Sequence, residues 1–145
     1  MGLTMKVAVI VTGGTIAATR EESGVGLYAP RCGTELLAVT AQLGSSHGYT
    51  VTLERWQYAG GKELPLVDSC EINGSHWVLL SAQIDRLLGD HAGVVVLHGT
   101  DTLAYTAAAL SMLEPKRAGN VVVTGAQIPL VERGTDAVDN LRLAL

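Results

Sequence analysis

Short apolar runs rich in valine and isoleucine alternate along this chain with longer segments of helical periodicity. The strand pattern covers four runs, residues 6–11, 50–55, 93–97 and 120–124, because each is short and dominated by β-branched residues. The helical pattern covers four segments, residues 33–43, 75–88, 102–113 and 136–145. Each predicted strand is therefore followed by a predicted helix.

The clearest helix is the segment 75–88, where five large apolar residues recur at helical spacing and fall on one face. Ser75 is the expected N-cap of this helix, and Gly89 suits its end. By the same reasoning, Asp136 is the expected N-cap of the last helix.

Four strand–helix units in series predict an α/β fold, a three-layer, doubly wound parallel sheet with helices on both faces. The expected strand order is 2-1-3-4, the common choice for a short domain of this kind. In such a sheet, ligands bind beyond the carboxyl ends of the strands, where the strand order reverses. The loops after the first and third strands are therefore the first places to look for a site.

Composition narrows the class of protein without identifying it. The 145 residues are 48% hydrophobic and 17% charged, enough apolar material for one core, and the net charge of −4 disfavours nucleic acid as a partner. No apolar run is long enough to cross a bilayer, and the first residues lack a signal-peptide pattern. Cys32 and Cys70 are read as reduced thiols, which together with the other features predicts a cytoplasmic protein.

Two polar loops follow the first and third predicted strands. Thr12-Gly-Gly-Thr15 combines glycines that allow close backbone approach with a hydroxyl and a backbone N–H at Thr15. The segment 98–102 (HGTDT) supplies a second hydroxyl at Thr100 and a carboxylate at Asp101. A threonine hydroxyl needs a neighbouring base to act as a nucleophile, and a carboxylate suits the amino group of a small substrate.

Each of these features also has a plain structural interpretation. A Gly-Gly-Thr turn after a first strand often only turns the chain or binds phosphate, and Asp101 before a helix is often an N-cap. His98 fits either an acid–base role or a packed structural histidine. The four histidines and two cysteines show no metal-ligand spacing, so neither a metal nor an organic cofactor is expected.

Taken together and in order, the motifs resemble a known family. Residues 12–17 (TGGTIA) and 98–106 (HGTDTLAYT) are similar to the two signature motifs of the bacterial-type L-asparaginases, which use a threonine nucleophile. Residues 122–129 (VVTGAQIP) and 135–141 (TDAVDNL) resemble the segments that follow in that family. The residues of the second motif resemble those of the family's cytoplasmic branch more than those of its periplasmic branch.

The resemblance implies a role for each matching residue. Thr15 matches the nucleophile that becomes acylated, and Tyr28 matches a tyrosine of a flexible loop that assists it. Ser69 matches the serine that binds the substrate's α-carboxylate. Thr100 and Asp101 match the second threonine, which helps to activate the attacking group, and the aspartate that pairs with the α-amino group. L-asparagine is then the expected substrate, with L-glutamine possible, in a homo-oligomeric enzyme.

The resemblance also implies what this chain lacks. In the family, a lysine later in the chain works with the Thr–Asp pair, and neither Lys6, Lys62 nor Lys116 stands in that place. The family's small C-terminal domain has no counterpart here. Residues 1–145 are therefore interpreted as an incomplete N-terminal domain, expected to be weakly active or inactive alone. The polar segment 20–30 is expected to form a mobile lid.

Three other functions remain in view. One is a non-catalytic remnant or ligand-binding module. Another is the asparaginase-like subunit of a tRNA-dependent amidotransferase, which carries an extra N-terminal domain in its family. The third is dinucleotide binding, for which Glu54 resembles a ribose-binding acid, but Gly13-Gly14-Thr15 does not fit the glycine fingerprint.

Overall fold

A computed structural model describes residues 5–20, 28–30, 34–114 and 118–145 of the chain. Its centre is a parallel sheet in the order β4 (Tyr49–Arg55), β1 (Met5–Val11), β5 (Gly93–Leu97) and β6 (Asn120–Thr124). Numbered by the four predicted strands, this is the order 2-1-3-4, so the predicted fold class and strand order are confirmed. The strand order reverses between β1 and β5.

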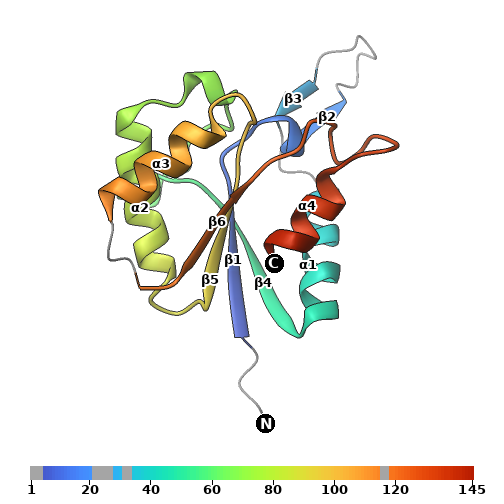
Figure 1. Ribbon diagram of the computed structural model, residues 1–145, viewed down its shortest axis with the longest axis horizontal. Coiled ribbons are helices and arrows are strands. Elements are labelled where there is room, and N and C mark those ends of the chain that lie inside the picture. Colours follow the sequence, from blue (N-terminus) through green and yellow to red (C-terminus); the bar gives the residue numbers. More distant parts are fainter. Residues whose placement is uncertain (1–4, 21–27, 31–33, 115–117) are drawn as a thin grey trace.

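Helices cover both faces of this sheet, as Figure 1 shows. The helices α2 (Gly74–Leu87) and α3 (Leu103–Leu113) lie on one face, and α1 (Thr34–His47) and α4 (Ala137–Ala144) lie on the other. Within the described residues, none of the helices is both long and apolar enough to cross a membrane.

Two apolar clusters, one on each face, follow from the side-chain alternation of the central strand. Val7, Val9 and Val11 of β1 join the cluster with α1 and α4, whereas Ala8 and Ile10 join the cluster with α2 and α3. All five of these residues are buried, and β5 is buried along its whole length. A strand buried on both faces requires a continuous apolar sequence, which is why the β-branched runs identified the strands so well.

A small antiparallel pair, β2 (Ala18–Arg20) with β3 (Tyr28–Pro30), was not predicted. It follows the short 3-10 helix η1 (Thr15–Ala17) and extends beyond the carboxyl end of β1 (Figure 1). The middle of the expected lid, residues 21–27, lies outside the described residues. The mobility of the lid therefore stays a prediction.

Of the two predicted N-caps, the one at Ser75 was wrong and the one at Asp136 is confirmed in position. The N-cap of α2 is Asn73 rather than Ser75: the Asn73 side chain accepts a hydrogen bond from the Ser75 backbone N–H (3.1 Å). His76 completes the cap by accepting a bond from the Asn73 N–H (3.2 Å). Asp136 does occupy the N-cap position of α4, but its side chain makes no capping bond there. Its carboxylate instead accepts hydrogen bonds from another segment of the protein, described below.

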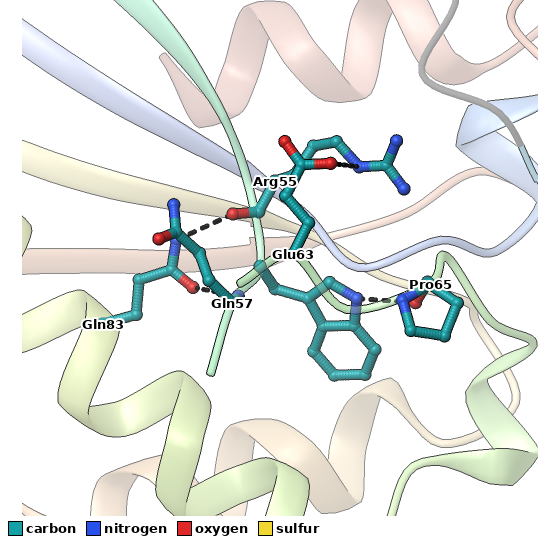
Figure 2. Close-up of polar contacts among 6 residues, drawn as sticks. Arg55, Gln57, Glu63, Pro65 and Gln83 are labelled. Carbon is teal, nitrogen blue, oxygen red and sulfur yellow. Dashed lines mark hydrogen bonds and ion pairs between the residues drawn. The ribbon is translucent and has the colours of Figure 1, made fainter. Parts of the chain in front are cut away.

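A buried glutamine fixes the chain where it leaves the edge strand β4 (Figure 2). Gln83 of α2 is 5% exposed, and its amide accepts a bond from Gln57 N and donates one to Arg55 O, both at 3.0 Å. Between these two residues, the buried Trp56 donates from its indole N–H to Pro65 O (2.8 Å). These bonds direct the segment after β4 back over the carboxyl edge of the sheet, where it supplies part of the candidate site.

Candidate active site

The four strands of the sheet end at the same level. Their last paired residues are Arg55, Val11, Leu97 and Thr124, so the loops that follow begin side by side along one edge. The first residue after β1, Thr12, is fully buried and donates from its hydroxyl to Leu97 O (2.9 Å). Thr12 therefore ties the ends of β1 and β5 together, and it is a structural residue of its motif.

The loops after β1 and β5 meet backbone against backbone. A Cβ atom at Gly14 would lie 2.3 Å from Gly99 Cα, far inside van der Waals contact. Gly14 also has φ 74° and ψ 179°, a region of backbone space that is essentially reserved for glycine. Two glycines, Gly14 and Gly99, therefore allow the two motif loops to converge.

A third loop enters from the segment after β4. Ser69 begins the short 3-10 helix η2 (Ser69–Glu71) and is 2% exposed. A Cβ at Gly99 would lie only 2.7 Å from the Ser69 side chain, and the Thr102 hydroxyl donates to Ser69 O (2.8 Å). Asp68 accepts a bond from Cys70 N (3.0 Å), which holds the pKa of its carboxyl below the usual value. Ser69 is thus fixed directly against the loop that carries Thr100 and Asp101.

These loops surround a cavity of about 260 Å³. It is lined by residues of four loops: Gly14, Thr15, Ala18, Asp68, Ser69, Gly99, Thr100, Asp101, Gln127 and Pro129. Four of the five predicted site residues, Thr15, Ser69, Thr100 and Asp101, therefore lie around one space. Among the described residues, the charged members of this lining are the carboxylates Asp68 and Asp101, which favour a ligand that carries a positive group.

The fifth predicted site residue, Tyr28, lies on β3, where its backbone pairs with Arg20 of β2. The residue that precedes this strand pair, Ala17, belongs to η1, which begins at Thr15. The strand pair that includes Tyr28 therefore follows directly on the short helix that begins with Thr15, the predicted nucleophile. Its catalytic role stays a prediction.

His98 is a structural residue of its motif and makes no contribution to the cavity lining. It is fully buried, and its Nε2 lies 2.9 Å from the Thr106 hydroxyl, which accepts a bond from the Trp77 indole N–H (2.9 Å). If the Thr106 proton is donated to Nε2, the other ring nitrogen, Nδ1, carries the proton and donates to Gly99 O (2.7 Å). This series of hydrogen bonds, from Trp77 of α2 through Thr106 of α3 to His98, thereby holds Gly99 in place.

This arrangement predicts how stability depends on pH. Burial lowers the pKa of His98 below its ordinary value, so the folded protein holds the ring neutral. Below pH about 6.5, the unfolded chain takes up a proton that the folded protein excludes, and stability falls by at most about 1.4 kcal/mol per pH unit for this group. NMR titration of the His98 ring should show a neutral Nδ1–H tautomer at pH 7. A protonation midpoint at or above 6.5 would contradict this account.

Two lining residues, Gln127 and Pro129, were not predicted as site residues. They lie in the loop after β6, at the same edge of the sheet as the other three loops. The predicted strand order already placed the fourth strand beside the third, and this loop was part of the family resemblance. The predicted position of the fourth strand beside the third was therefore the sequence signal that could have placed this loop at the site. Among the described residues, no group of three or more His, Cys, Asp or Glu side chains is placed to hold a metal ion.

Comparison with known proteins agrees with this geometry. The family model described as "Asparaginase, N-terminal" matches residues 6–145. L-asparaginase 1 of Escherichia coli strain K12 is 37% identical over 139 residues, which cover 94% of this chain and 38% of that protein. The solved structure of the thermostable L-asparaginase from Thermococcus kodakarensis matches with a TM-score of 0.79 and 32% identity, covering 97% of this chain and 39% of that one. A probable cytoplasmic L-asparaginase from Campylobacter jejuni matches with a TM-score of 0.71 and 26% identity, covering 97% and 40%.

Proposed function

We propose that this chain, which belongs to the asparaginase family, carries the nucleophile and most of the substrate pocket of an enzyme that hydrolyses L-asparagine to L-aspartate and ammonia. The observation that carries the proposal is the convergence of Thr15, Ser69, Thr100 and Asp101 on one cavity. Its volume of about 260 Å³ is below the range of roughly 300–1,000 Å³ that suits drug-sized ligands, so a small amino acid is the appropriate class of substrate.

In the proposed reaction, the Thr15 hydroxyl oxygen attacks the side-chain amide carbon of asparagine. The C–N bond breaks, the hydroxyl proton leaves with the nitrogen as ammonia, and an aspartyl ester of Thr15 remains. Water then cleaves the ester, which restores the hydroxyl and releases L-aspartate. No metal or organic cofactor takes part in these two proposed steps.

The other residues receive the roles that their family counterparts suggest. Asp101 pairs with the substrate ammonium, in keeping with the carboxylate-lined cavity, and Ser69 binds the α-carboxylate. Thr100 assists proton transfer at the attacking oxygen, and Tyr28 assists Thr15 from the strand pair beside it. Positioned proton transfer of this kind contributes about 10²–10⁴ in rate.

The chain spans 38% of the length of the Escherichia coli relative, and the resemblance places none of Lys6, Lys62 and Lys116 at the position of the family's lysine. We therefore propose that residues 1–145 form the N-terminal domain portion of the fold and show little activity as an isolated polypeptide. A cytoplasmic location and a homo-oligomeric assembly belong to the same proposal. The name of the Campylobacter jejuni neighbour supports the location, and light scattering of the purified protein tests the assembly.

The decisive assay measures ammonia release from L-asparagine, with L-glutamine and buffer alone as comparisons. It is run on the protein at its natural length and on residues 1–145, after circular dichroism has shown that each is folded. We expect turnover of L-asparagine by the former. We also expect a rate lower by at least about 10² for residues 1–145, because none of their lysines stands in the place of the family's lysine. A folded natural-length protein that releases no ammonia from either amide would refute the function and favour a non-catalytic ligand-binding module.

A further inference from the structure

We propose that Asp136 and Asn140, which lie outside the cavity, are positioning residues that hold one wall of it in place. The wall is the loop 125–129, which supplies Gln127 and Pro129 to the lining. The inference rests on the proposed function, because it assigns these residues a part in orienting the substrate of that site. It also makes a structural claim that is testable without any activity.

The Asp136 carboxylate binds the loop through two consecutive backbone N–H groups. Gln127 N lies 3.1 and 3.0 Å from the two carboxylate oxygens, and Ile128 N lies 2.9 Å from one of them. These bonds, led by the one from Gln127, keep the pKa of Asp136 below its usual value. The hydroxyl of the preceding residue, Thr135, accepts a bond from Ala137 N (3.0 Å), and Asp136 occupies the N-cap position without a side-chain capping bond. The Asp136 side chain is thereby free to hold the loop.

Asn140 closes the arrangement one helical turn further on. Its side-chain amide donates to Gly125 O (2.9 Å) and to the Asp136 carboxylate (3.1 Å). Residues four apart on a helix lie on the same face, so α4 presents both side chains to the loop together. The loop is therefore held near its first residue by Asn140 and in its middle by Asp136. The Thr135 hydroxyl adds a bond to Ile128 O (2.9 Å).

The loop is in turn packed against the residues of the proposed chemistry. A Cβ at Gly125 would lie 2.4 Å from His98 O and 3.3 Å from Thr100 Cγ2. A shift of the loop therefore changes both the cavity wall at Gln127 and the surroundings of Thr100. Because a misplacement of about 1 Å can cost about 10²-fold in rate, the contacts made by α4 are expected to matter for catalysis.

The test compares Asp136→Asn with Asp139→Asn in the protein at its natural length. Asp139 is a matched control, because it lies on the same helix and its carboxylate pairs with Arg142 on the surface. The Asp136→Asn amide keeps the shape of the carboxylate but turns an NH₂ group toward N–H donors. We expect kcat/KM for L-asparagine, corrected for the folded fraction, to fall about 10- to 100-fold, mainly through kcat. Asp139→Asn should stay within about twofold.

Hydrogen exchange gives the second readout. The backbone amides of Gln127 and Ile128 should exchange faster in Asp136→Asn than in the control variant, with the amides of β5 unchanged. Asn140→Ala serves as a second variant if Asp136→Asn folds poorly, and it should also lower kcat. Unchanged exchange would show that the carboxylate does not hold the loop. Faster exchange with unchanged kcat would show that the loop does not orient the substrate, and either result overturns the proposal. If the unaltered protein releases no ammonia, the proposed function fails, while the exchange measurement still judges the structural claim.

Discussion

Replacement of Thr15 by alanine is expected to abolish hydrolysis of L-asparagine without unfolding the protein. Thr15 is half-buried on the cavity lining at the start of η1, and its hydroxyl is the group that would form the ester. Loss of the nucleophile in a serine hydrolase lowers kcat by about 10⁶, and a loss of that order is expected here. The other threonine on the lining, Thr100, belongs to a different loop and would not replace it.

Steady-state kinetics on the natural-length protein measures this effect, with Thr15→Ser as the matched control that keeps a hydroxyl at the same position. Thr15→Ser should retain far more activity than Thr15→Ala. Calorimetric titration with L-aspartate, the expected product, should show that Thr15→Ala still binds a ligand in the cavity. Thr15→Ala with activity near that of the unaltered protein would mean that another group attacks the amide.

Replacement of Gly14 by alanine is expected to have the largest effect on the fold of the site. The new Cβ would lie 2.3 Å from Gly99 Cα, and no side-chain rotation relieves a contact with backbone. The φ and ψ of Gly14 also belong to a region that alanine avoids. Overpacking and backbone strain together are expected to cost about 2–6 kcal/mol. If the variant folds, it must separate the two motif loops, so its activity should fall as well.

Gly48→Ala separates the two causes. Gly48 also has a positive φ of 79°, but a Cβ there would meet no atom within 4 Å. It should therefore show only the strain of the left-handed conformation, about 1–2 kcal/mol. Denaturant unfolding of the two variants provides the comparison. Equal losses of stability would show that the contact between Gly14 and Gly99 is much looser than the structure has it.

The sheet was predictable because its sequence signal is local and strong. The valine runs of β5 and β6 were placed at their observed ends. β5 begins at a glycine and ends just before the polar His98, and β6 begins at an asparagine and ends at a threonine. The pair β2–β3 was missed because strands of three residues show too little alternation to be distinguished from a loop. Local pattern is therefore a good guide to the buried layer and a poor one to the short elements around the site.

The wrong cap of α2 and the missing capping bond of Asp136 have a different cause. Asn73 and Ser75 are both favoured N-cap residues, and the choice of Asn73 depends on a return bond to His76, which is not part of the usual capping signature. Asp136 lies at the expected N-cap position, but its carboxylate accepts hydrogen bonds from the backbone N–H groups of Gln127 and Ile128. Whether such a side chain caps its own helix or bonds to a distant segment depends on the folded structure, so the pattern along the chain does not reveal it.

The convergence of the four loops was only partly predictable. The motifs placed Thr15, Thr100 and Asp101 at one edge, and the family resemblance added Ser69. The contributions of Gln127 and Pro129 required the actual path of the loop after β6. What the sequence pattern does not contain is the set of backbone contacts, such as that between Gly14 and Gly99, which decide how closely the loops approach.

Trapping of the covalent intermediate tests the central claim most directly. The natural-length protein is mixed with L-asparagine, quenched in acid within the first turnover, digested and examined by mass spectrometry. The account predicts an aspartyl ester on the hydroxyl of Thr15, absent from Thr15→Ala treated in the same way. Active protein that carries the ester on another residue, such as Thr100, would contradict the assignment of Thr15 as the nucleophile.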